Sequence, residues 1–301
     1  MKSINDILEL PKADVHNHLH LSGSRKLLSK YYPEANLKFP EKYNGLPGMI
    51  DFIYGHLNSI MLDSKDVECF MEMAVLAAIE DNVTLLEASV DVGLARFFGD
   101  SIEEVITIVK KLKDKYESKI SFKPDIGVNK DLDLNKIYSD GIKCIESGVF
   151  NGIDFYGKEQ GQNLKPFVRF YDTARDFNLK TKVHIGEFSD AESIEEAIML
   201  LNPNEIQHGI RAAESEKTMD LILKHNIRLN VCPESNIALG AAIDLKTHPI
   251  KRLSEYGIKV CVNTDDLLLF NATVSNQFIN LFKEGVFTVE EIEKLRLNAF
   301  Q

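Results

Sequence analysis

The stretch Ala13-Asp14-Val15-His16-Asn17-His18-Leu19 begins as a β-type run and ends in two histidines one residue apart. Successive side chains of a strand point to opposite faces, so His16 and His18 would project the same way and grip one ion from one side. Two later fragments also place a residue that can ligate zinc at the end of a β-type run: His184-Ile185-Gly186-Glu187 and Asn263-Thr264-Asp265-Asp266. We therefore expect the three fragments to meet in one metal site.

Strand-like and helix-like segments alternate along the chain, which predicts an α/β fold with a parallel sheet and crossover helices. The predicted strands are residues 13–19, 84–90, 120–127, 149–155, 180–185, 204–208, 227–232 and 258–263. Ser101 and Ser193 each stand three residues before a glutamate, a capping-box spacing that marks helix starts between the strands.

Eight strand-then-helix repeats predict a closed (β/α)₈ barrel of the TIM type. The length of 301 residues fits one such domain, residues 1–301. Apolar periodicity in 48–61 and 66–80 predicts additional helices inserted between strands 1 and 2, where they would lie over the mouth of the barrel.

On such a barrel the candidate site residues share one location, the carboxyl ends of the strands, where active sites of these barrels are built. They follow strands 1, 5, 6 and 8: His16 and His18, His184, His208, and Asp265 with Asp266. A single histidine there is more often a packed residue, and an aspartate is often a turn or helix cap. Because these residues all lie at the same end of the barrel, a shared functional site is favoured over separate packing or capping roles. His248, before Pro249 at a predicted helix start, is expected to be structural.

Composition disfavours several kinds of partner. Lys and Arg number 35 against 46 Asp and Glu, which gives a net charge of −11. No basic stripe is present in the sequence, so we do not expect the protein to bind nucleic acid. No apolar run approaches the roughly 18 residues of a membrane span, and the N-terminus lacks the apolar core of a signal peptide. The four cysteines form no C-x-x-C pair and lie in or beside apolar segments. We therefore expect a cytoplasmic protein.

Six fragments, in this order and spacing, resemble the motifs of the adenosine deaminase family over nearly the whole chain. They are Leu10–Leu19, His184–Glu187, Ile206–Gly209, Cys232–Asn236, His248–Ile250 and Asn263–Asp266. The resemblance implies a zinc-dependent purine aminohydrolase on a (β/α)₈ barrel, with one Zn²⁺ per chain and a small-molecule 6-aminopurine substrate such as adenosine.

The same resemblance implies a role for each site residue. The metal ligands would be His16, His18, His184 and Asp265. Glu187 would donate a proton to the purine ring, and His208 would act on the attacking water. Asp266 and the backbone of Gly157 would hold the purine N7 and N3.

The residue types suit this chemistry without the family name. Three imidazoles and a carboxylate are typical zinc ligands. Attack of water on a purine C6 pushes electrons onto N1, so an acid beside the ring is needed, and Glu187 lies three residues beyond His184. A phosphoesterase-like metal hydrolase would need more ligands at strand ends than the chain offers. A catalytically inactive purine-binding protein is disfavoured because every proposed ligand and Glu187 are present.

The segment after His18 departs from the family pattern. Relatives usually have Leu-Asp-Gly-Ser or similar, whereas residues 19–24 read Leu-His-Leu-Ser-Gly-Ser, which adds two residues. An alternative register would make His18 and His20 the metal ligands. The preceding Leu-Pro-Lys of residues 10–12 favours His16 and His18 instead.

Two further departures concern substrate binding. His20 stands where an acidic residue often meets the ribose, and Ser89 stands where many relatives have arginine. A histidine neither accepts strongly from a free 5′-hydroxyl nor strongly repels a 5′-phosphate. We therefore expect weaker discrimination between adenosine and its 5′-modified analogues than in a relative with aspartate at position 20.

Overall fold

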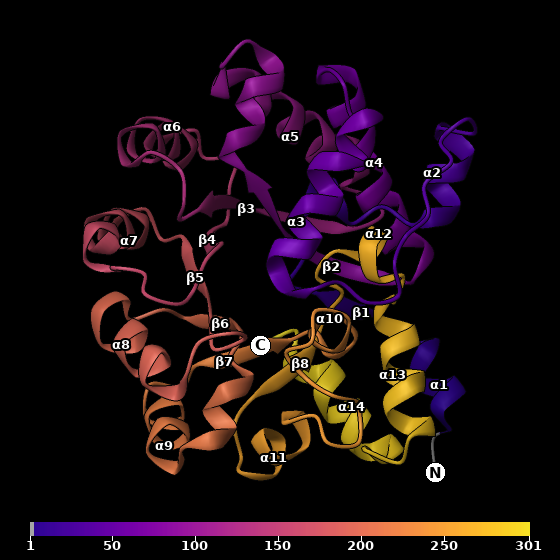
Figure 1. The fold of residues 1–301 in the computed structure, drawn as a ribbon, viewed down its shortest axis with the longest axis vertical. Coiled ribbons are helices and arrows are strands. Elements are labelled where there is room, and N and C mark those ends of the chain that lie inside the picture. The colour runs from indigo at the N-terminus through magenta and orange to yellow at the C-terminus, as the bar shows by residue number, and fades with distance from the viewer. Residues whose placement is uncertain (1–2) are drawn as a thin grey trace.

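Eight parallel strands form one sheet that follows the order of the chain. The computed structural model describes residues 3–301, and each strand pairs with the next. The strands are β1 (Lys12–Asp14), β2 (Val83–Asp91), β3 (Ser121–Asn129), β4 (Gly152–Tyr156), β5 (Lys180–Ile185), β6 (Glu205–His208), β7 (Arg228–Val231) and β8 (Val260–Val262). The backbone N–H of Asp265 donates to the His16 carbonyl (2.9 Å), which joins the segments after β8 and β1. The fold is therefore the expected (β/α)₈ barrel (Figure 1).

Strand β1 is shorter than the strand predicted at 13–19. It ends at Asp14, and the chain beyond it touches its neighbours through single bridges, from Asn17 to the segment after β8 and from His18 to β2. Regular strand alternation therefore does not extend to His16 and His18. Their side chains nevertheless reach the same place, as described below.

Helices surround the strands. They are α1 (Ile4–Leu8), α2 (Arg25–Tyr31), α3 (Gly45–Gly55), α4 (Ser64–Glu80), α5 (Ile102–Tyr116), α6 (Leu134–Glu146), α7 (Val168–Asp176), α8 (Ala191–Leu201), α9 (Glu216–Lys224), α10 (Pro233–Ala238), α11 (Ile250–Glu255), α12 (Leu267–Phe270), α13 (Val274–Lys283) and α14 (Val289–Asn298). Ser101 caps α5 as predicted. The prediction for Ser193 was wrong: α8 begins earlier, and Asp190 is its cap, accepting from the Ser193 N–H.

The predicted insertion between the first two strands is present as α2, α3, α4 and a short 3-10 helix, η2 (Leu57–Ser59). Helix α4 packs into the main core along its apolar face. Helix α3 lies over the barrel mouth, where Leu46, Met49, Ile50, Ile53 and Tyr54 line a cavity that also borders the predicted site residues. The insertion therefore supplies one wall of the candidate site.

Charged side chains fill the barrel interior beneath that mouth. The Lys182 ammonium is fully buried and lies 2.6 Å from Asp125 Oδ2 and 2.7 Å from Glu87 Oε2. Burial opposes the charge on Glu87, but Lys182 and Lys180 outweigh it and hold the pKa of Glu87 at about 2. These ion pairs form the bottom of the site, and each buried charge has a partner of opposite sign.

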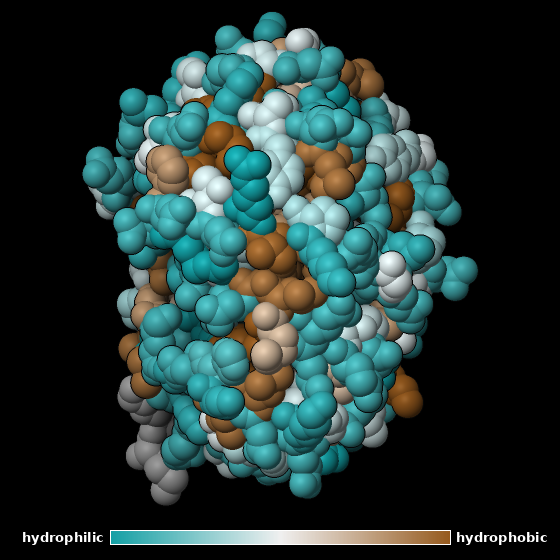
Figure 2. Space-filling view, turned by 90° about the vertical axis from the view of Figure 1, so that its left-hand side faces the viewer, coloured by the Kyte–Doolittle hydropathy of each residue, from teal (hydrophilic) through white to brown (hydrophobic). Residues whose placement is uncertain are grey.

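The outer surface is mostly hydrophilic. Figure 2 shows the side covered by α6, α7 and α8, where apolar side chains emerge in a narrow band among polar ones. Among residues 3–301, no helix combines the length and the apolar character needed to cross a membrane.

Candidate metal and purine site

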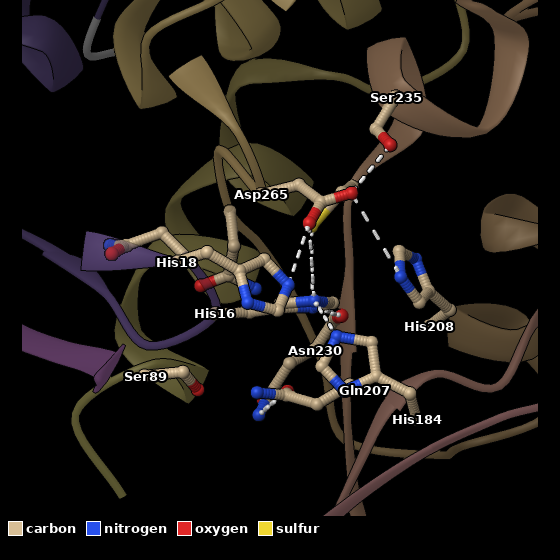
Figure 3. A network of polar contacts seen from close by, with 12 residues as sticks. His16, His18, Ser89, His184, Gln207, His208, Asn230, Ser235 and Asp265 are labelled. Atoms are coloured by element: carbon tan, nitrogen blue, oxygen red, sulfur yellow. Dashed lines mark hydrogen bonds and ion pairs between the residues drawn. The ribbon is translucent and has the colours of Figure 1, made fainter. Parts of the chain in front are cut away.

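Four predicted ligands converge at the carboxyl ends of β1, β5 and β8. One donor atom from each of His16, His18, His184 and Asp265 lies within 4.8 Å of the others, and all four residues are buried or nearly so. Asp265 Oδ1 lies 3.7 Å from His16 Nε2 and 3.6 Å from His18 Nε2. Nε2 of His16 and of His184 are 3.0 Å apart. Tetrahedral zinc with bonds of about 2.0–2.1 Å needs donors roughly 3.3 Å apart, so the spacing fits (Figure 3).

In His16 and His184, a hydrogen bond at Nδ1 leaves the other ring nitrogen, Nε2, free to bind a metal ion. His16 Nδ1 lies 2.7 Å from the Asn230 carbonyl oxygen, and His184 Nδ1 lies 3.1 Å from Asp154 Oδ1. Each Nδ1 must carry the proton to make its bond, so each Nε2 presents a lone pair. Two such lone pairs 3.0 Å apart repel unless a cation lies between them. The four ligand atoms of His16, His18, His184 and Asp265, called the donor group below, therefore fit a metal ion.

Ser89 contributes to this arrangement from β2. Its hydroxyl donates to Asp154 Oδ2, while Asp154 Oδ1 faces His184. Serine, in place of the arginine of many relatives, thus helps to hold the carboxylate that orients His184.

A second group of possible ligands consists of His16, His208, Cys232 and Asp265. It is less suitable, because His16 Nδ1, the ring nitrogen nearest Cys232, already donates to a carbonyl oxygen. Burial also raises the pKa of the Cys232 thiol well above its usual range, which disfavours the thiolate that binds metal.

His20 lies apart from both groups of possible ligands. It falls in a 3-10 helix, η1 (Leu19–Leu21), and lines the cavity above the donor group. Burial, with the nearby His18, lowers the pKa of His20 to about 3, so the ring is neutral at pH 7. The structure thus places His16 and His18, and not His20, in the group of possible ligands, while His20 lines the cavity.

Glu187 and His208 face each other beside the donor group, with Glu187 Oε2 3.5 Å from His208 Nε2. Burial, followed by the charges of Asp265 and Glu159, raises the pKa of Glu187 well above its usual range. Burial and the neighbouring His16 hold the pKa of His208 well below its usual range. Both shifts favour the uncharged forms, a protonated carboxylic acid beside a neutral imidazole.

The carboxylate of Glu159 holds the turn that carries Glu187. Its Oε2 accepts from the N–H groups of Gly186 (2.9 Å), Phe188 (3.1 Å) and Ser189 (2.9 Å), and from the Ser189 hydroxyl (2.8 Å). Gly186 has a φ of +76°, and an added Cβ would lie 2.4 Å from Ile194 Cδ1. Glycine and a buried anion together fix where Glu187 leaves β5.

A cavity of about 220 Å³ lies between the donor group and α3. The other predicted site residues, Gly157 and Asp266, also line it. Among the described residues, four buried polar atoms in its wall have no hydrogen-bond partner: His20 Nδ1, Asn58 Oδ1, the Tyr156 hydroxyl and Asp266 Oδ1. Buried polar atoms are rarely left unpaired, so this wall is suited to a polar ligand.

Asp266 and Gly157 bracket the cavity from opposite sides. Burial raises the pKa of Asp266 to about 8, with His18 opposing and Asp265 adding to the shift, so this carboxyl is protonated at pH 7. Gly157 has a φ of +99°, and an added Cβ would lie 2.5 Å from Asn129 Oδ1. Only glycine fits that position without displacing its neighbours.

Comparison with known proteins identifies the relatives of this chain. A family model described as adenosine deaminase matches residues 11–301. The chain belongs to the adenosine deaminase family. A Treponema pallidum protein that carries the name adenosine/adenine deaminase is 32% identical over 295 residues, which cover 98% of this chain and 99% of that protein.

Solved structures agree with this assignment at the level of the fold. An adenine deaminase from Arthrobacter aurescens matches with a TM-score of 0.84 at 24% identity, over 96% of this chain and 92% of that one. A zinc-bound amidohydrolase from Burkholderia ambifaria matches with a TM-score of 0.81 at 18% identity, over 99% and 87%. As a member of the adenosine deaminase family, the protein is a metal-dependent aminohydrolase of the adenosine/adenine deaminase type.

Four residues around the deaminase site were not singled out from the sequence. Asp154 orients His184, Glu159 holds the turn of Glu187, and Tyr156 packs its ring edge-on against His18 at 4.6 Å. Asn236 donates to Glu187 Oε1 at 2.6 Å. Asp154 and Tyr156 lie in β4 and Glu159 lies just after it, so Gly157 between them was the available signal for all three.

Proposed function

We propose that the protein hydrolyses the 6-amino group of adenosine or a closely related 6-aminopurine, with one Zn²⁺ held by His16, His18, His184 and Asp265. Water adds at C6, the C6–N bond breaks, and ammonia leaves as the 6-oxopurine forms. The zinc ion would lower the pKa of a water molecule bound beside these four residues to about 7 and so supply a nucleophile at neutral pH.

The match between donors in the cavity and acceptors on a purine is the observation that carries the proposal. The ring nitrogens N1, N3 and N7 of a 6-aminopurine all accept hydrogen bonds. The cavity offers a protonated Glu187, the backbone N–H of Gly157 and a protonated Asp266. Ionised carboxylates could only repel N1 and N7, so the raised pKa values of both acids suit a purine.

Each residue has a distinct task in the proposed reaction. Glu187 transfers its proton to N1 as electrons move into the ring, and it then helps to pass a proton to the departing amine. Asp266 and Gly157 hold the base so that C6 faces the donor group. The His208 ring hydrogen-bonds the attacking water. Helix α3 covers the cavity and limits access of bulk solvent.

The strand order indicates where a substituent at N9 would lie. With N1 toward β5, N3 toward β4 and N7 toward the segment after β8, N9 faces the remaining arc, the ends of β1 to β3. This arc contributes these residues to the cavity wall: His20, Asp91, Arg96, Asn129 and Asp131.

The charge of this arc favours an uncharged N9 substituent. Arg96 is the one lysine or arginine among the described residues of the cavity wall, and it stands against Asp91 and Asp131. Burial keeps His20 neutral. A 5′-phosphate would meet more negative than positive charge there, whereas a free base or an uncharged ribose would not. We therefore propose that tolerance at the 5′ position extends to uncharged changes and not to phosphate.

One experiment tests this function. Metal content is measured in protein never exposed to chelator, and ammonia release is measured with adenine, adenosine, 5′-deoxyadenosine and adenosine 5′-monophosphate. We expect close to one zinc per chain and turnover of the uncharged substrates only. Purine binding without ammonia release would indicate an inactive binding protein. Phosphate release in place of ammonia would indicate a phosphoesterase, and either result overturns the proposal.

A further inference from the structure

We propose that Asn236 and His248 are positioning residues that fix which atoms of Glu187 and His208 face the substrate. The inference rests on the proposed deamination for its kinetic test. It rests on the structure alone for the atoms that are held. Neither Asn236 nor His248 is among the residues that line the cavity.

The hydrogen bonds that link His248, Asn236, Glu187 and His208, called the relay below, begin at the first residue of α11. The backbone N–H of Ile250, the first residue of α11, donates to His248 Nδ1 at 3.1 Å. An N–H group can only donate, so Nδ1 is the unprotonated nitrogen and a neutral His248 carries its proton on Nε2. His248 Nε2 lies 3.2 Å from Asn236 Oδ1 and therefore donates to it.

That bond sets the orientation of the Asn236 amide. Because Oδ1 accepts from His248, the Nδ2 group points the other way, and its two hydrogens reach two acceptors. Nδ2 lies 2.6 Å from Glu187 Oε1 and 3.1 Å from His208 Nδ1. A flipped amide would put an oxygen against both acceptors, and His248 would lose its own acceptor.

The two contacts decide where protons sit in the site. Glu187 Oε1 accepts from Asn236, so the transferable proton of this acid is on Oε2, which faces His208 Nε2 at 3.5 Å. His208 Nδ1 also accepts from Asn236, so a neutral His208 carries its proton on Nε2. The relay thus presents His208 to the attacking water as a hydrogen-bond donor, and it keeps the transferable proton of Glu187 on Oε2.

The two positioning residues are shielded from solvent. Asn236 is 0% exposed and His248 is 3% exposed, so solvent has little access to replace a lost partner. Asn236 lies on α10, directly after β7, and His248 precedes Pro249 at the start of α11. Two positions in the chain between β7 and β8 therefore control two catalytic groups that lie at the ends of β5 and β6.

The kinetic test uses substitutions of graded severity in the metal-loaded enzyme. His248→Ala removes the donor to Asn236, and we expect kcat to fall roughly 10-fold with KM and zinc content unchanged. His248→Gln places an amide N–H near the position of Nε2 and should restore kcat to within about 3-fold of wild type. Asn236→Asp replaces the donor by a carboxylate beside Glu187 and should lower kcat by roughly 100-fold or more.

A matched control separates positioning from general destabilisation. Asn298 is also buried, and its Nδ2 donates to the Val260 carbonyl oxygen at 2.9 Å, away from the cavity. Asn298→Asp should lower the melting temperature and leave kcat unchanged. If His248→Ala and His248→Gln lower kcat equally, or if every variant lowers kcat only in proportion to its loss of folded protein, the positioning role is wrong.

A spectroscopic measurement tests the relay without relying on activity. In zinc-loaded protein labelled with ¹⁵N in its histidines, ring nitrogen chemical shifts report which nitrogen carries the proton. We expect His208 and His248 to carry it on Nε2, and we expect His208 to lose this single form in His248→Ala. A His208 proton on Nδ1 in the wild type overturns the relay. Absence of turnover together with the expected tautomers would overturn the proposed function alone.

Discussion

Acidification should destabilise the protein through His248. Burial lowers the pKa of His248 to about 4 in the folded chain, against about 6.5 for a solvated histidine. Between these values the unfolded chain binds a proton that the folded chain does not, so the free energy of unfolding rises with pH. The stability is fully present above about pH 6.5 and is lost as the pH falls toward 4. For one histidine the loss is about 2 kcal/mol at pH 5 and about 3 kcal/mol below pH 4.

Urea unfolding of the wild type and of His248→Gln at pH 7 and pH 5 measures this effect. Other buried groups titrate in both proteins and cancel in the comparison, so the wild type should lose about 2 kcal/mol more than the variant. His225→Gln, at the exposed end of α9, is the matched control and should behave as the wild type does. Equal losses in the wild type and in His248→Gln would refute the reasoning.

Three further predictions concern the site. His184→Ala should remove both zinc and activity, and elemental analysis checks this, since zinc retained at full occupancy would show that the ligand set is wrong. Glu187→Gln keeps the shape but lacks the transferable proton, so turnover should fall by a factor of about 10² to 10⁴ with zinc retained, and a near-normal rate would remove Glu187 from the mechanism. His20→Asp should increase the preference for adenosine over 5′-deoxyadenosine in kcat/KM. Equal ratios in the two proteins would show that His20 does not set specificity.

The barrel could be predicted because its signals are repeated. Eight apolar strands alternate with helices, and each of the eight predicted strands overlaps one in the structure. The ends of elements were less predictable, since they depend on tertiary contacts. Strand β1 ends at Asp14 because the chain beyond it makes only single bridges with its neighbours. Helix α8 begins at Ala191 because Asp190 offers an earlier cap than Ser193.

Residue types predicted which groups meet in the site, but they carried no information on how those groups are oriented. The order of the motifs located all the proposed ligands and the acid Glu187 at one end of the barrel. The partners that orient them, such as Asp154 for His184 and Asn236 for Glu187, come from strands or loops distant in sequence. A contact of this kind has no local pattern, because an asparagine after β7 looks the same whether its amide faces solvent or a catalytic acid.

The backbone conformation at the strand ends explains why the site residues converge, although regular strand alternation stops before His16 and His18. Asp265 has a φ of +58° and His208 a φ of +62°, a left-handed conformation that residues other than glycine seldom adopt. Each conformation turns the chain at the point where a strand ends and brings a polar side chain back over the barrel axis. Such conformations cost on the order of 1–3 kcal/mol and persist where surrounding contacts hold them. Here Ser235 donates to Asp265 Oδ2 at 2.5 Å, and Asn236 donates to His208 Nδ1. The segment after β7 therefore holds the two turns from which Asp265 reaches the candidate metal site and His208 reaches the cavity beside it.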